Sequence, residues 1–214
     1  CQLASMRDLP DPAPRTERIL CGWNPSEPAD DTLVVGRISD GEGNLKAVIV
    51  NYACHPTTLA WENTAISPDF PGAMRDTIQE TLGVPALFMQ GASGELSPRY
   101  QYVGDTEVAD RHGRQLAYAA LATLEDMEPP MTCLEFEGVM ESGAPLAVWR
   151  HEPIEPSSVL KALEVKVELP LKDWPSSEEL ERLRQECPDR ALEERLRRRR
   201  NIRRGIGDGT TLEL

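Results

Sequence analysis

The feature that most constrains the fold is AVIVNYA, a nearly continuous apolar run of seven residues at positions 47–53. The run is short for a helix and rich in β-branched and aromatic side chains, so it predicts a strand covered on both faces. The stretch TLVVGRISD at 32–40 is similarly strand-like, and the Gly-Glu-Gly-Asn connection between the two runs is typical of a hairpin. The second strand stops on Cys54, His55 and Pro56.

Two strand-loop-helix units can be followed along the chain from this point. Residues 67–83 carry helix signals at both ends, with Asp69 as N-cap, Pro71 in the first turn and Gly83 as the stop. A second apolar run, VPALFMQ at 84–90, leads into the loop GASGELSPR, and residues 105–127 have helical periodicity. The pattern predicts an α/β fold: a mixed sheet with a βαβα core, helices packed on it, and active-site loops at the carboxyl ends of the strands.

Composition shifts divide the chain into three parts. Residues 1–31 are rich in Pro, Asp and Arg and predict an extended approach segment with little to pack. Residues 32–170 form the central α/β part, with further strands expected at 131–140, 144–151 and 158–171. Residues 171–214 predict a charged helical segment, either an insertion in that domain or its continuation, with helices opened by Ser176 and Asp189.

The overall charge excludes one broad class of function. The formal net charge of −13 argues against general nucleic-acid binding, which needs a basic face. No run approaches about 18 apolar residues, so no membrane span is predicted. The five cysteines have no metal-binding spacing, and reduced thiols are the expectation. Because the chain opens at Cys1 without a basic-then-apolar leader, no compartment can be predicted from this end.

Seven arginines gather near the end of the chain, and two interpretations apply to them. They would suit a polyanion-binding patch or the solvated surface of a helix. Glutamates lie among them and just before them, which favours the solvated helix. The arginines are Arg195, Arg197, Arg198, Arg199, Arg200, Arg203 and Arg204.

Polar residues follow both central strands and define a candidate site. His55 follows the apolar run at 47–53, and the loop after the run at 84–90 carries Glu95 and Ser97, so all three could line one cleft at the sheet edge. Polar residues also collect in such loops by default, and that alternative stays open. The segment GASGELS fails as a nucleophile elbow because Glu95 stands where glycine is required. For His112 and His151 we expect surface or core positions.

Four segments in order, VNYACHPTTL, ISPDFPGAMRDTIQE, ALFMQGASGELSPR and RHGRQLA, resemble the neutral/alkaline (non-lysosomal) ceramidase family and its bacterial relatives. The resemblance covers roughly Leu33 to Leu124. It implies that the chain is a central fragment of the family's N-terminal catalytic domain. The His-x-His, Gly-Glu and tyrosine segments that complete the family's metal site are not found in this sequence.

The resemblance also implies roles for individual residues. His55 takes the position of a zinc ligand, with Zn²⁺ as cofactor and its remaining ligands expected outside this chain. Ser97 takes the position of the active-site serine, within a motif in which Gly94 is shared and Glu95 replaces the family's aspartate. Asp69 takes the position of an aspartate expected to support the site structurally or to position its groups.

The leading hypothesis is therefore a zinc-dependent amide hydrolase of neutral ceramidase type. Its substrate would be a small-molecule or lipid N-acyl amide such as ceramide, and the isolated chain should have little or no activity. One alternative is a non-catalytic α/β binding module on the same scaffold. Another is a metal-independent serine hydrolase with Ser97 as nucleophile and His55 as base, which requires a hydrogen bond between them. By resemblance the protein would be secreted or periplasmic, and the sequence does not indicate its oligomeric state.

Overall fold

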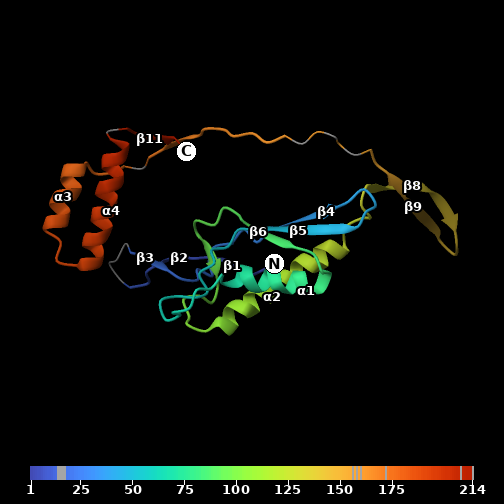
Figure 1. Cartoon of the computed structure of the whole chain (residues 1–214), viewed down its shortest axis with the longest axis horizontal. Coiled ribbons are helices and arrows are strands. Elements are labelled where there is room, and N and C mark those ends of the chain that lie inside the picture. Colours follow the sequence, from blue (N-terminus) through green and yellow to red (C-terminus); the bar gives the residue numbers. More distant parts are fainter. Residues whose placement is uncertain are drawn as a thin grey trace. The chain divides into compact units, whose positions relative to one another are not determined.

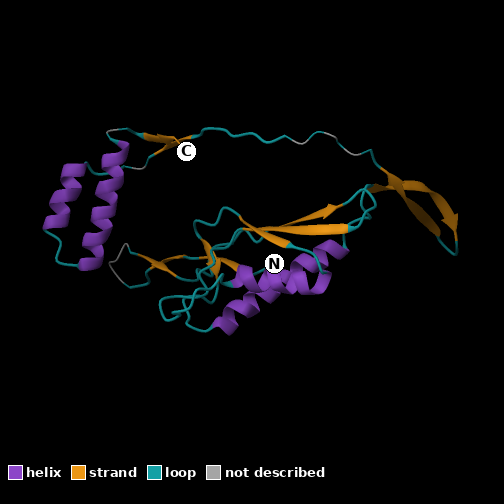
Figure 2. Ribbon diagram, in the orientation of Figure 1, coloured by secondary structure: helices purple, strands orange, loops and turns teal. Residues whose placement is uncertain are grey.

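A computed structural model of the chain describes residues 1–13, 18–155, 157, 159, 161–171, 173–207 and 209–213. The chain forms two compact units, Cys1–Pro156 and Ser157–Leu214, which are considered separately (Figures 1 and 2). The first unit contains every residue of the candidate site. The second contains the arginine cluster.

The first unit is built on a three-stranded mixed sheet of order β4-β5-β6. β4 (Leu33–Ser39) pairs antiparallel with β5 (Leu45–Tyr52), and β5 pairs parallel with β6 (Ala86–Gln90). The hairpin turn is held by the Asp40 carboxylate, which accepts from the backbone N–H groups of Glu42 and Asn44. Gly43 has a φ of 86°, a conformation that glycine adopts without strain. The predicted hairpin is confirmed.

Two helices complete the βαβα order, and their ends are those that the sequence predicts. α1 (Phe70–Leu82) is capped by Asp69, which accepts from the N–H of Phe70, and it ends at left-handed Gly83. α2 (Thr106–Glu125) is capped by Asp105. The α/β prediction, with helices packed on a mixed sheet, is therefore confirmed.

Both helices cover the same face of the sheet (Figure 2). Alternate residues of β5 point into the resulting core, and helix residues meet them there. The main members of this core are Val48, Val50 and Tyr52 from β5, Phe70, Met74 and Ile78 from α1, and Leu116, Ala117 and Ala120 from α2.

The prediction that the central strand is covered on both faces is wrong. The side of the sheet opposite the helices is open, because α1 and α2 both pack on one side. On the open side Val34, Leu87 and Met89 are 54%, 50% and 55% exposed. The apolar run of β5 therefore reflects one buried face plus a partly exposed one, rather than a strand between two helical layers.

The N-terminal segment packs more closely than its composition predicts. β1 (Ala4–Met6) pairs antiparallel with β7 (Leu96–Pro98), while β2 (Asp8–Pro10) pairs with β3 (Ile19–Cys21). Leu3 and Ala4 are buried in the main core. The Tyr52 hydroxyl accepts from the N–H of Ala4 at 2.9 Å and donates to the carbonyl of Cys1 at 2.8 Å. Two apolar residues and one buried phenol thus secure this segment.

The first unit ends in a long hairpin of β8 (Thr132–Glu141) and β9 (Pro145–Pro153), where two strands were predicted. Its side chains are mostly exposed. Phe136 and Trp149 lie opposite one another, edge to face, with ring centroids 5.7 Å apart.

The second unit is a helical hairpin with a short strand pair. α3 (Ser177–Gln185) is capped by Ser176, and α4 (Arg190–Ile206) by Asp189, as predicted. β10 (Glu168–Pro170) pairs with β11 (Thr211–Glu213). The strand expected over 158–171 is restricted to β10, and positions 158 and 160 of that range lie outside the described residues.

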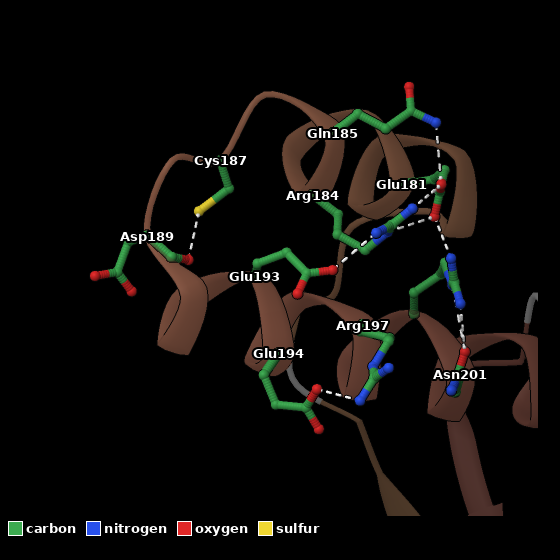
Figure 3. A network of polar contacts seen from close by, with 10 residues as sticks. Glu181, Arg184, Gln185, Cys187, Asp189, Glu193, Glu194, Arg197 and Asn201 are labelled. Atoms are coloured by element: carbon green, nitrogen blue, oxygen red, sulfur yellow. Dashed lines mark hydrogen bonds and ion pairs between the residues drawn. The ribbon is translucent and has the colours of Figure 1, made fainter.

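Most of the clustered arginines have partners within the second unit. Arg184 bridges Glu181 and Glu193 with N–O distances of 2.8 Å, and Arg197 pairs with Glu194 (Figure 3). Arg184 lies outside the cluster, on α3, whereas Arg197 belongs to it. Four more cluster members have partners: Arg198 pairs with Glu194, Arg200 pairs with Glu181, Arg203 donates to the carbonyl of Gly209, and Arg199 stacks on Trp174. These contacts favour the solvated-helix interpretation.

Candidate functional site

His55 lies immediately beyond the carboxyl end of β5, with its ring held in one orientation. Its backbone N–H donates to the carbonyl of Leu96 at 2.9 Å, and its Nδ1 lies 2.5 Å from the carbonyl oxygen of Ser93. Because a carbonyl oxygen only accepts, Nδ1 must carry the proton. In the neutral ring Nε2 then has a free lone pair, which can coordinate a metal or accept a proton.

Ser93 is the residue that fixes this imidazole, and it comes from the loop after β6. Its carbonyl also accepts from the N–H of Leu96 at 3.1 Å, which closes a tight turn. Its hydroxyl accepts from Nε2 of Gln90 at 2.6 Å, and the same amide donates to the carbonyl of Cys54 at 3.0 Å. The loops after β5 and β6 are therefore joined into one polar network at the sheet edge.

Gly91 allows these two loops to approach each other. Its N–H donates to the carbonyl of Tyr52, and a Cβ at this position would lie 3.0 Å from the Cα, Cβ and N atoms of Ala53. Any larger side chain would push the loop that carries Ser93 away from His55. No motif in the sequence indicates a role for Gln90, Gly91 or Ser93, although their places at and after the end of β6 put them at the sheet edge where we expect His55.

Ser97 lies on the buried side of the same loop. It is part of β7, its side chain is 0% exposed, and its hydroxyl has no hydrogen-bond partner among the described residues. Its carbonyl accepts from the hydroxyl of Ser5, the residue opposite it on β1. The hydrogen bond to His55 that a serine hydrolase mechanism requires is not made in this structure.

Gly94 and Glu95 occupy the exposed tip of the turn between Ser93 and Leu96. The backbone carbonyl of Glu95 accepts from the N–H of Arg7 at 2.9 Å. No heavy atom lies within 4 Å of a Cβ built on Gly94. The structure therefore gives no steric reason for glycine there, and it places the Glu95 side chain at the surface.

Asp69 connects α1 to the loop that follows His55. One carboxylate oxygen accepts from the N–H of Phe70 at 2.7 Å, and the other accepts from the N–H of Leu59 at 2.8 Å. Its φ of 54° is unusual for a residue with a side chain, and its two hydrogen bonds hold it there. Asp69 thus fixes the start of a helix and the path of the candidate site loop together.

A second buried polar group lies behind this loop. Thr58 is fully buried, and its hydroxyl lies 3.0 Å from Nδ1 of His112 on α2. Burial, together with the charge of Arg111, holds the pKa of His112 below its ordinary value of 6.5, although Asp69 opposes the shift. Burial, and to a lesser degree the charge of Asp69, raises the pKa of the Cys54 thiol to about 12.

His151, the third histidine, instead lies exposed on β9, with Nε2 2.5 Å from a carboxylate oxygen of Glu128.

No cluster of three or more His, Cys, Asp or Glu side chains suited to a metal ion occurs among the described residues. His55 is the one residue among them that the resemblance predicts as a zinc ligand. In the same part of the chain, no helix has the length and apolar character needed to cross a bilayer.

Comparison with known families gives no matching family, and comparison with curated proteins gives no match. Two solved structures are similar to the chain. They are a ceramidase complexed with C2 and the neutral ceramidase from Pseudomonas aeruginosa. Each has 21% sequence identity and a TM-score of 0.41, with 56% of this chain covered. The chain spans 20% of the length of each of those proteins.

Proposed function

We propose that this chain supplies part of the active site of a zinc-dependent amide hydrolase of the neutral ceramidase kind. Its substrate would be an N-acyl amide such as ceramide. The motif resemblance set out above supports the family, and the geometry of His55 supports the site. The observation that carries the proposal is the hydrogen bond from Nδ1–H of His55 to the carbonyl of Ser93, which leaves Nε2 without a partner among the described residues.

The donor chemistry of His55 suits zinc. Histidine ligands of zinc commonly donate their other ring N–H to a carbonyl or carboxylate, which fixes the tautomer and the ring plane. The proposal has Nε2 of His55 as one ligand and assigns the others to groups outside this chain. When bound, zinc would lower the pKa of a coordinated water and polarise the amide carbonyl of the substrate.

The remaining residues of the site have positioning and proton-transfer roles in this proposal. Ser93 holds the His55 ring, and Asp69 holds the loop behind it. Glu95 is the exposed acid of the adjoining turn, so we assign it the exchange of a proton with the substrate. Ser97 would contact substrate only if β1 moved away from β7, because its hydroxyl is buried.

The first test is a zinc titration of the 214-residue chain, followed through the nitrogen resonances of its three histidines. We expect Nε2 of His55 to shift saturably and the response to disappear in His55→Ala. The His151→Ala variant is the matched control, since it removes an exposed histidine from the far hairpin. If zinc shifts His112 or His151 and leaves His55 unchanged, the assignment of the ligand is wrong.

A second measurement addresses the reaction class. Hydrolysis of a short-chain N-acyl amide by this chain should be weak or undetectable, because His55 alone does not make a catalytic zinc site. Robust hydrolysis that resists chelators and persists in His55→Ala would contradict the zinc mechanism. Robust hydrolysis that disappears in Ser97→Ala would instead support the serine hydrolase alternative.

A further inference from the structure

The first unit contains a small cavity, open to the surface, whose polar lining groups include several hydrogen-bond donors. Its volume is about 270 Å³. The polar groups around it are a guanidinium, an imidazole, two carboxamides and a phenol, and no carboxylate lines it. The lining residues are Gln2, Leu3, Arg99, Tyr100, His112 and Gln115. None of these residues belongs to the proposed zinc site.

Arg99 is the only formal positive charge on the cavity wall, and it is held in place by stacking. Its guanidinium carbon lies 4.8 Å from the ring centroid of Trp23. In the described part of the chain, no ion pair or hydrogen bond engages the Arg99 side chain. Stacking restrains the plane of a guanidinium but leaves its N–H edge available, so Arg99 is preorganised for an anion.

His112 contributes a directed neutral donor. It is 8% exposed, and its Nδ1 meets the hydroxyl of Thr58 at 3.0 Å. Thr58 is fully buried, and its hydroxyl makes no other hydrogen bond among the described residues, so its proton is satisfied by donation to Nδ1. The neutral ring therefore carries its own proton on Nε2, and His112 is one of the residues that line the cavity.

We propose that this cavity binds the carboxylate group of a small monoanionic molecule. One guanidinium charge balances one negative charge, and the imidazole and carboxamides supply neutral N–H donors for the remaining lone pairs. A doubly charged phosphate is less well matched. The adjoining cavity, which shares Gln2 and Arg99, is lined by Glu27 and Asp31, and their charges oppose a second negative charge.

The surroundings make such binding selective rather than a property of the whole surface. The protein carries a net charge of −13, so its general field repels anions. Binding of an anion here has to rest on the local donors. The size of the cavity suits a short-chain acid, with the carboxylate toward Arg99 and a short alkyl group near Leu3.

The test is a titration of the 214-residue chain with sodium acetate and sodium butyrate at constant ionic strength, balanced with sodium chloride. The side-chain N–H signals of Arg99 and His112 are followed by NMR. We expect saturable shifts with a dissociation constant on the order of millimolar, which lies within the affinity ceiling of so small a ligand. Arg99→Ala should weaken binding by about tenfold or more, because a charged hydrogen bond is lost.

Arg114→Ala is the matched control, since Arg114 is an exposed arginine on the same α2 as His112 and does not line the cavity. It should change the affinity less than about twofold. Arg99 is exposed, so its removal should leave the fold intact, and the thermal unfolding midpoint checks this. Equal affinities in Arg99→Ala and the parent would overturn the proposal, as would the same shifts with chloride alone. Tighter binding of inorganic phosphate than of acetate would overturn the carboxylate assignment.

Discussion

The crossing of α1 and α2 depends on Gly113, and substituting alanine there should destabilise the first unit. A Cβ at this position would lie 2.5 Å from the carbonyl oxygen of Phe70, 2.6 Å from the Cβ of Ala73 and 2.7 Å from the backbone nitrogen of Met74. Two of these three atoms belong to the backbone of α1, so no rotamer change can relieve the contact. The helices would have to separate.

The expected magnitude follows from these distances. Optimal separations between carbon atoms are about 3.5–4.0 Å, so the helices must move apart by about 1 Å at this point. Overpacking of this kind costs roughly 1–3 kcal/mol and occasionally more. Replacing glycine by alanine within a helix recovers at most about 1 kcal/mol of intrinsic propensity. Because two of the three contacts are with backbone atoms, we take the upper part of that range, about 2–3 kcal/mol. After the propensity gain is subtracted, the Gly113→Ala variant should lose about 1–2 kcal/mol of unfolding free energy.

Hydrogen exchange of the α1 and α2 amides as a function of denaturant would measure this loss in the first unit alone. Gly94→Ala is the control, because a Cβ at Gly94 meets no atom within 4 Å, and its effect should stay within about 0.5 kcal/mol. If Gly113→Ala is as stable as the parent or more stable, the close helix crossing is refuted.

Three further predictions concern buried polar groups. Tyr52→Phe should cost about 1–3 kcal/mol in urea unfolding, because the N–H of Ala4 loses its acceptor inside the core. Since burial lowers the pKa of His112, the unfolded chain binds that proton more readily. The unfolding free energy should be fully present above pH 6.5 and should fall as the pH drops through the folded-state pKa of His112. Urea unfolding midpoints measured at a series of pH values would show this fall, and the His112→Gln variant should lack it. Cys54, with a pKa of about 12, should resist thiol reagents at pH 8 until unfolding, whereas exposed Cys21 reacts at once, as mass spectrometry of labelled peptides would show.

The elements that the sequence predicts well are those whose ends are set locally. Asp69, Ser176 and Asp189 each cap a helix with their own side chain, and Gly83 ends α1 in a left-handed conformation. Such contacts span one to four residues, so the sequence pattern contains all the information that they need.

Tertiary contacts were harder to predict because they depend on which surfaces meet. Leu3 is buried next to Ala4, whose N–H donates to the hydroxyl of Tyr52, 48 residues away. The open face of the sheet results from both helices packing on one side, and the apolar composition of β5 does not reveal this. The partner of His55 is a backbone carbonyl, which any residue could supply at position 93, so no motif indicates it.

The partner of Nδ1 also bears on which role suits His55 better. A general base becomes an imidazolium during reaction, and a neighbouring carboxylate usually stabilises that charge. In this structure Nδ1–H meets the neutral carbonyl of Ser93, which fixes the tautomer but supplies no compensating charge. A metal ligand stays neutral throughout, so it needs orientation and no such charge. The Ser97 hydroxyl is buried and unbonded within the described residues, which argues against His55 as the base of a serine hydrolase and supports our proposal that it is a ligand through Nε2.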